Sequence, residues 1–80
     1  MNKDRFMEYF HNDKYRGVLL KIINEELPSK QRTYFIERFI NGRPQKYIAE
    51  KYGTSHTTIS QMTNKAADKV MGYFKYVLEV

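Results

Sequence analysis

Short polar side chains gather between residues 56 and 65, directly after a glycine-containing turn at 53–55. Such side chains can reach base edges in the DNA major groove: Gln and Asn pair with adenine, Lys with guanine or a phosphate, and Thr methyls meet thymine methyls. Polar residues are also ordinary on a solvated helix face, so composition alone leaves both interpretations open. The candidate base contacts, on the face opposite Ile59 and Ala66, are His56, Thr57, Ser60, Gln61, Asn64 and Lys65.

The residues before this segment predict a short helix and a sharp turn. The helix is expected from Pro44 to Tyr52, with Ile48, Ala49 and Tyr52 buried. Alanine at position 49 lets a second helix cross close by. Gly53 can adopt positive φ without steric penalty, so it suits the reversal of the chain that follows.

A second helix is expected to begin after an N-cap at Ser55, with Thr54 as the alternative, because a hydroxyl can accept hydrogen bonds from first-turn amides. Its apolar repeat continues to about Leu78, and Gly72 marks a change of character, after which a separate helix is one alternative. Helix, glycine turn and polar second helix together predict a helix-turn-helix. Its recognition helix, about residues 56–70, would lie in the DNA major groove.

Positive charge supports a nucleic-acid partner. The chain carries 14 Lys and Arg residues against nine Asp and Glu, a formal charge of +5, and such a surplus attracts polyanions. A merely solvated role stays open for each basic residue. The candidate phosphate contacts are Gln31, Arg32, Arg38, Arg43, Lys46, Lys51 and Thr58.

The rest of the chain also has helical periodicity, with apolar residues at intervals of three and four and no sustained strand-like alternation. Further helices are expected from Lys3 to Leu27, with a break at 11–13, and from Ser29 to Ile40, closed by Asn41-Gly42. The predicted fold is all-α, a bundle of four to five helices. The predicted organisation is a single domain, 1–80, with an amphipathic helical extension (1–26), a helix-turn-helix core (27–70) and a C-terminal helical tail (71–80).

Several stretches follow a known family pattern. LPSKQR at 27–32 fits L-P-x-x-Q-R, IAEKYGTS at 48–55 fits I-A-E-x-x-G-x-S, and AADKV at 66–70 is close to A-x-x-K-L. On these residues the chain resembles region 4 of bacterial sigma factors; LuxR-type response regulators and several small phage and plasmid regulators share much of the pattern. The resemblance implies an all-α helix-turn-helix fold and a transcriptional regulator that binds double-stranded DNA.

Two features depart from the family. Met62 and Thr63 stand where it often has a basic residue and a leucine, which leaves the facing of the recognition helix open by about one position. The chain also has no room for the region 2 domain of a complete sigma factor, so we do not expect it to act as a conventional sigma factor by itself.

Apolar residues near both ends suggest a second kind of partner. They could bury one another, pair across a homodimer, or receive a protein such as RNA polymerase, which the resemblance implies. In the last case the domain would be a protein-interaction module with weak DNA binding. If the tails pair, two recognition helices would be spaced for an inverted repeat about one DNA turn apart. The candidate dimer or partner face comprises Phe6, Phe10, Tyr73, Phe74, Tyr76 and Val77.

Other classes of protein find little support. The chain has no cysteine, which excludes disulfides and thiolate metal sites. Its histidines, His11 and His56, lack metal-ligand spacing. We therefore expect no enzymatic activity, no catalytic or metal-ligating residue and no cofactor. No apolar run approaches the roughly 18 residues that span a membrane, and the N-terminus carries charges where a signal peptide is apolar, so a cytoplasmic location is expected.

Overall fold

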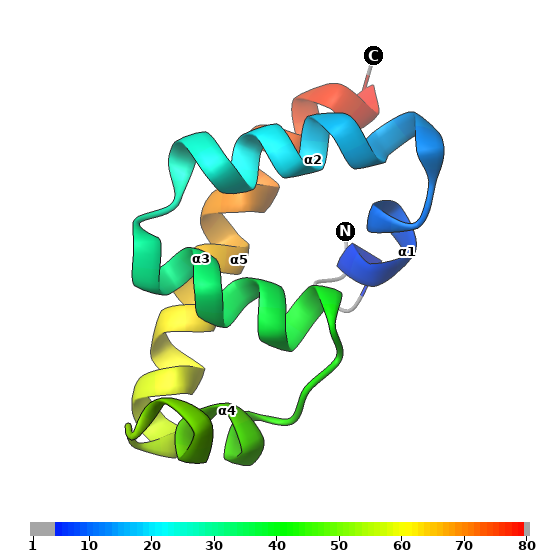
Figure 1. Ribbon diagram of the computed structural model, residues 1–80. Helices are drawn as coiled ribbons and strands as arrows, with labels where there is room; N and C mark the ends of the chain where they lie inside the picture. The colour runs from blue at the N-terminus through cyan, green and yellow to red at the C-terminus, as the bar shows by residue number, and fades with distance from the viewer. Residues whose placement is uncertain (1–4, 80) are drawn as a thin grey trace.

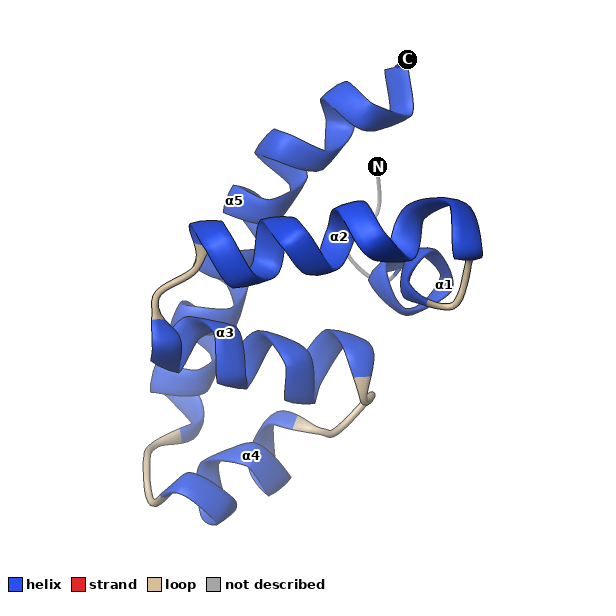
Figure 2. Ribbon diagram, turned by 45° about the horizontal axis from the view of Figure 1, so that its top comes forward, coloured by secondary structure: helices blue, strands red, loops and turns tan. Residues whose placement is uncertain are grey.

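The computed structural model describes the backbone of residues 5–79 and the side chains of residues 5–76. In this part of the chain the regular elements are all helical, with no strand (Figure 2). The predicted all-α fold is confirmed. In chain order the elements are α1 (Phe6–Phe10), α2 (Asp13–Glu26), α3 (Ser29–Phe35), the π-helix η2 (Ile36–Ile40), α4 (Gln45–Tyr52) and α5 (His56–Glu79).

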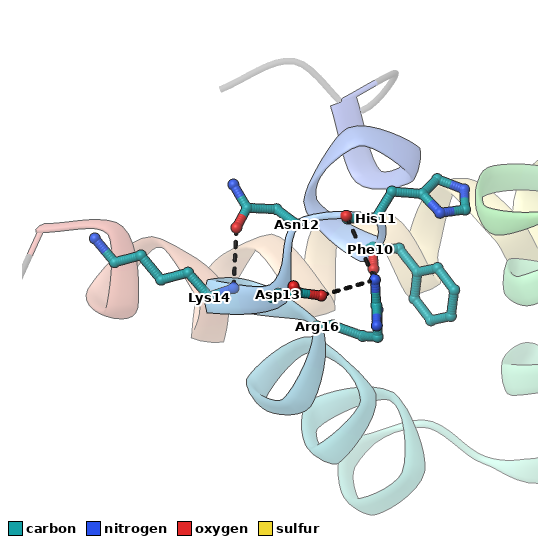
Figure 3. A network of polar contacts seen from close by, with 6 residues as sticks. All are labelled: Phe10, His11, Asn12, Asp13, Lys14 and Arg16. Carbon is teal, nitrogen blue, oxygen red and sulfur yellow. Dashed lines mark hydrogen bonds and ion pairs between the residues drawn. The ribbon is translucent and has the colours of Figure 1, made fainter.

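The expected break near Asn12 separates α1 from α2 (Figure 3). The Asn12 side chain caps α2 by accepting a hydrogen bond from the backbone N–H of Lys14 at 2.9 Å. Arg16 Nε donates to the carbonyl of Phe10 at 2.8 Å, and its Nη2 lies 3.2 Å from a carboxylate oxygen of Asp13. The first turn of α2 therefore holds the end of α1.

Helix α3 continues into η2 without a turn, so together they form the single helix expected from Ser29 to Ile40. The last turn differs from an α-helix, because the N–H of Asn41 donates to the carbonyl of Ile36, five residues back, at 2.9 Å. Gly42, with φ +72°, then turns the chain toward α4. The predicted left-handed closure is confirmed.

Most of the apolar core lies between α2, the α3–η2 segment and the C-terminal half of α5, with α1 closing one end (Figure 1). Phe6 lies edge-on to Phe35 and Phe39, with ring centroids 5.1 and 5.6 Å apart. We call this group the large cluster; its buried members are Phe6, Leu19, Ile23, Leu27, Phe35, Phe39, Ile40, Ala66, Ala67, Val70 and Phe74.

A second group of buried residues lies where α4 crosses the N-terminal half of α5, against α3. We call it the small cluster; its buried members are Tyr34, Ile48, Ala49 and Ile59, with Met62 partly buried against them. Burial of Ile48 and Ala49 agrees with the sequence. Tyr52, expected to be buried with them, is 38% exposed; its ring lies against that of Tyr34, with centroids 5.2 Å apart, and its hydroxyl donates to Glu37.

Helix α5 runs without interruption from His56 to Glu79. At 1.5 Å per residue, its 24 residues span about 36 Å, enough to pack against α4, α3 and α2 in turn (Figure 1). Gly72 therefore does not begin a separate helix. None of the described helices is long and apolar enough to cross a membrane.

The predicted partner face is only partly at the surface. Phe6 and Phe74 are buried in the large cluster, so the chain covers them with its own residues and they cannot form an exposed face. Phe10 is half-buried, whereas Tyr73 and Tyr76 are exposed. The side chain of Val77 lies outside the described residues.

Candidate nucleic-acid interface

A fixed turn joins α4 to α5. Gly53 has φ +65° and ends α4 in the left-handed conformation. The Ser55 hydroxyl accepts a hydrogen bond from the backbone N–H of Thr58 at 3.0 Å and donates to the Thr58 hydroxyl at 2.8 Å. The predicted N-cap is confirmed, and the hydroxyl of Thr58, a predicted phosphate contact, is engaged in the cap.

Side-chain burial fixes the facing of α5. Ile59, Thr63 and Ala66 are fully buried, and the Thr63 hydroxyl donates to the carbonyl of Ile59 at 2.6 Å. Met62 is only partly buried, against the small cluster. The question left open by the sequence is thereby answered: Thr63 faces the core, and Met62 lies at its margin.

The predicted base contacts divide into two groups on the other side of α5. His56, Thr57, Gln61 and Lys65 are exposed. Ser60 and Asn64 are half-buried, and Asn64 Nδ2 lies 3.5 Å from the Ser60 hydroxyl. All belong to the first three turns of the helix, and residues four apart lie above one another on a helix face. The structure thus gathers the predicted residues, with the second group at the edge nearest η2.

Arg38, a predicted phosphate contact, links η2 to α5. Its Nη1 donates to the Thr63 hydroxyl and to Asn64 Oδ1, the latter at 3.0 Å. With the Gln45 amide oriented so that its oxygen faces the guanidinium, that oxygen accepts from Nη2 at 3.0 Å. The guanidinium also lies over the ring of Phe39, 4.7 Å from its centroid. Arg38 therefore joins the α3–η2 segment, which supports the helix-turn-helix from outside and which we call the bracing helix, to both helices of the helix-turn-helix, α4 and α5.

Glu37, the neighbouring residue, holds the end of α4. It is 7% exposed and accepts hydrogen bonds from Lys51 Nζ at 2.7 Å, the Tyr52 hydroxyl at 3.0 Å and Asn41 Nδ2 at 3.3 Å. The bond from Lys51 lowers the pKa of the Glu37 carboxyl, although burial opposes it. The bond to Glu37 raises the pKa of Lys51. Lys51, a predicted phosphate contact, is thus paired with a buried carboxylate, although its own side chain is 46% exposed.

The remaining predicted phosphate contacts lie in two places. Arg43 and Lys46 are exposed beside the start of α4, and the Arg43 guanidinium lies over the ring of Tyr47, 5.0 Å from its centroid. Gln31 and Arg32 are half-buried at the start of α3, the far end of the α3–η2 segment from Arg43. Arg32 Nη2 donates to the carbonyl of Leu27 at 3.4 Å, which steadies the turn between α2 and α3.

Sequence reasoning missed Glu37 and Gln45. Glu37 is the only acid in the apolar stretch from Phe35 to Ile40, and a carboxylate among core positions is rare unless it is paired. That isolation was a usable signal. Gln45 gave none, because a glutamine in the first turn of a helix is usually solvated.

Among the side chains of residues 5–76, no group of three or more His, Cys, Asp or Glu residues is arranged to hold a metal ion.

Helix α4, the left-handed turn at Gly53 and helix α5 with its exposed polar face form a helix-turn-helix, which the bracing helix α3–η2 supports. The family model described as Sigma-70, region 4 matches residues 25–70, more than half of the chain, and this protein belongs to that family. The match agrees with the resemblance to sigma factors; it does not extend to features specific to LuxR-type regulators. Searches of curated proteins and of solved structures gave no significant match.

Proposed function

We propose that this chain is a sequence-specific transcriptional regulator that binds double-stranded DNA through α5. The observation that carries the proposal is the exposure of Thr57, Gln61 and Lys65 on the first turns of α5, directly after a turn fixed by Gly53 and Ser55. Their side chains are short or flexible enough to reach base edges while the helix lies in the groove. Membership of the region 4 family supports a DNA-binding role.

The phosphate contacts in this proposal are fewer than those expected from the sequence. Arg43 and Lys46 are exposed near the start of α4 and are suited to clamp the backbone. Arg38 and Lys51 are assigned to internal support instead, because each already bonds to other side chains. We assign no catalytic step to the protein.

Fluorescence anisotropy with pooled random duplexes at several salt concentrations tests the proposal. Lys46→Ala should weaken binding to all sequences and reduce the salt slope, because loss of a phosphate contact means that fewer counterions are released on binding. Lys75→Ala is the matched control: Lys75 is also exposed, but it lies on the last turns of α5, away from the start of α4, and its loss should change binding little.

Gln61→Ala separates sequence-specific from sequence-blind binding. Selection of bound duplexes from a random pool should give a consensus for the unmodified protein, and Gln61→Ala should relax it at one base pair. Weak affinity without a consensus, unchanged by Gln61→Ala, would contradict sequence-specific DNA binding.

The second candidate is a protein-interaction module with weak DNA binding. It is favoured by the internal pairing of Arg38 and Lys51, which leaves fewer cations for DNA, and by the exposed Tyr73 and Tyr76 on the last turns of α5. RNA polymerase and a second copy of the chain are its candidate partners. A monomer in sedimentation experiments at high protein concentration would exclude the homodimer. Binding to RNA polymerase that is lost in Tyr76→Ala would support polymerase as the partner.

A further inference from the structure

We infer that Arg38 is a positioning residue that sets which bases Asn64 can read, and that Asn64 therefore selects guanine or thymine rather than adenine. The inference rests on the proposed DNA-binding function and specifies the chemistry at one of its contacts. It comes from the bond between Arg38 Nη1 and Asn64 Oδ1, which joins η2 to the half-buried edge of α5.

The orientation of the Asn64 amide follows from the chemistry of its partner. A guanidinium carries only hydrogen-bond donors, so the group of Asn64 that lies 3.0 Å from Arg38 must be the carbonyl oxygen. The Nδ2 group then points away from Arg38, toward Ser60, whose hydroxyl lies at a long 3.5 Å. The amide hydrogens are thus the part of Asn64 that remains available to a ligand.

Arg38 itself is held firmly. Besides Asn64, it donates to the buried Thr63 hydroxyl and to the Gln45 amide oxygen, and its guanidinium lies over the Phe39 ring. Hydrogen bonds from an ionised donor are about twice as strong as neutral ones. Release of the Asn64 carbonyl would therefore cost a charge-assisted bond in a partly buried place.

Adenine recognition by asparagine needs both ends of the amide, because the carbonyl accepts from N6 and the amide donates to N7. In Asn64 one lone pair of the carbonyl is engaged, and the guanidinium charge beside it disfavours approach of another donor such as N6. The same charge polarises the amide and strengthens its hydrogens as donors. Edges that offer only acceptors, O6 and N7 of guanine or O4 of thymine, are the ones that fit.

Gln61 provides an internal comparison, one turn earlier on α5. It is exposed, and among the described residues its side chain makes no hydrogen bond, so both ends of its amide can serve a base. Gln61 should accept adenine in the ordinary way, whereas Asn64 should not. Two amides on one helix are thus expected to have different base preferences because only one has Arg38 as a neighbour.

The first test needs no DNA. In the free protein, ¹⁵N relaxation should show the Asn64 side-chain amide nearly as ordered as the backbone and that of Gln61 mobile. Arg38→Lys, which keeps the charge, and Arg38→Met, which removes it, should both loosen Asn64 and leave Gln61 unchanged. An Asn64 amide as mobile as that of Gln61 in the unmodified protein would overturn the inference.

The second test uses the selected duplex. Asn64→Ala locates the base pair that Asn64 reads, and competition then compares all base pairs at that position. The unmodified protein should favour guanine or thymine over adenine by about fivefold, and Arg38→Met should move the preference toward adenine by a similar factor. The pair read by Gln61 should change less than about twofold in Arg38→Met, because that amide does not touch Arg38.

The outcomes separate the two ideas. Arg38→Lys, which keeps a donor and the charge, should retain part of the preference for guanine or thymine and serves if Arg38→Met does not fold. Preference for adenine in the unmodified protein, or a preference unmoved by both Arg38 variants, would overturn the inference while leaving DNA binding intact. Absence of salt-dependent binding to any duplex would overturn the proposed function and this inference with it.

Discussion

The large and small clusters hold the two halves of α5 by different means. The large cluster packs Phe6, Phe35, Phe39 and Phe74 with aliphatic side chains from α2 and the C-terminal half of α5. The small cluster has far fewer buried side chains, and Ala49 contributes little area. Around it, the polar bonds of Glu37 and Arg38 connect η2 with α4 and α5.

This difference follows from what each region must leave exposed. Helix α5 buries its inner face from Ile59 to Phe74, but around the small cluster it packs against the short α4 and against α3. A groove-binding helix must keep its other face open. Polar links can fix helix orientation with little covered area, so we expect the large cluster to set stability and the polar links to set the geometry of the helix-turn-helix.

The largest expected effect comes from breaking the large cluster. Phe74 is fully buried, with its ring 5.1 Å from that of Tyr9. Phe74→Ala should lower the free energy of unfolding by about 3–5 kcal/mol, which unfolds much of a domain this small. Urea denaturation followed by circular dichroism measures it. Tyr76→Ala, at a side chain 62% exposed, is the control and should stay within about 0.5 kcal/mol; equal losses in both would refute the comparison.

Glu37→Gln should produce the next largest effect. It removes the charge that accepts from Lys51 and leaves an amide hydrogen facing donors, so the free energy of unfolding at neutral pH should fall by about 1–2 kcal/mol. The loss of stability is limited because the Lys51 side chain is partly solvated, which weakens its ion pair with Glu37. Asn41, Lys51 and Tyr52 should become more mobile. Hydrogen exchange of the α2 backbone amides should not change once the lower global stability of the variant is taken into account.

The same variant has a defined pH dependence. The pKa of Glu37 is lowered in the folded protein, so its contribution is complete above the ordinary value of 4.5 and is lost as pH falls through the lower folded value. The pKa of Lys51 is raised, so its contribution is complete below 10.5 and is lost at higher pH. The stability difference between the unmodified protein and Glu37→Gln should therefore be widest between these values and narrow in acid. A constant difference down to pH 2–3 would disprove the assignment.

Gly53→Ala tests the turn of the helix-turn-helix. The residue has φ +65°, and a left-handed conformation costs a residue with a side chain about 1–2 kcal/mol. Thermal unfolding should register the loss, and DNA affinity should fall with it. Gly17→Ala is a control of opposite sign: no atom lies within 4 Å of a Cβ added there and its φ is not positive, so alanine should stabilise α2 by about 0.5–1 kcal/mol.

Ser55→Ala should have the smallest effect on stability. Loss of the N-cap bond to the Thr58 amide costs about 1 kcal/mol. Ser55→Asp should restore that cap, because Asp is an equally good N-cap residue. Amide exchange in the first turn of α5 measures both. A first turn equally protected in Ser55→Ala would show that the cap is not needed to hold it.

Much of this architecture could be predicted from the sequence. Breakers and caps act locally, so Asn12, Gly42, Gly53 and Ser55 lie at or beside the helix boundaries where they were expected. The family pattern gave the order of the helix-turn-helix.

The polar contacts between helices could not be predicted in this way. Arg38 and Lys51 look the same in sequence whether they face solvent, DNA or another helix. The packing of η2 against its neighbours determines that Arg38 bonds to Asn64 and that Lys51 bonds to Glu37. The sequence placed Phe6 and Phe74 on a partner face because both are large and apolar. Their burial depends on contacts between distant segments: Phe6 packs against Phe35 and Phe39, and Phe74 packs against Tyr9 and Tyr15. Long-range pairing of this kind leaves no mark in local periodicity.

The π-helical turn of η2 has a consequence for how the two ends of the molecule are oriented. Each residue advances an α-helix by about 100° around its axis, and the bond from Asn41 to Ile36 closes a turn that holds one residue more than an α-helical turn would. If one residue were deleted between Ile36 and Ile40 and the turn closed as an α-helix, the chain leaving toward α4 would start from a different side of the bracing helix. The one extra residue in the η2 turn thus sets the direction in which the chain leaves the bracing helix toward the helix-turn-helix.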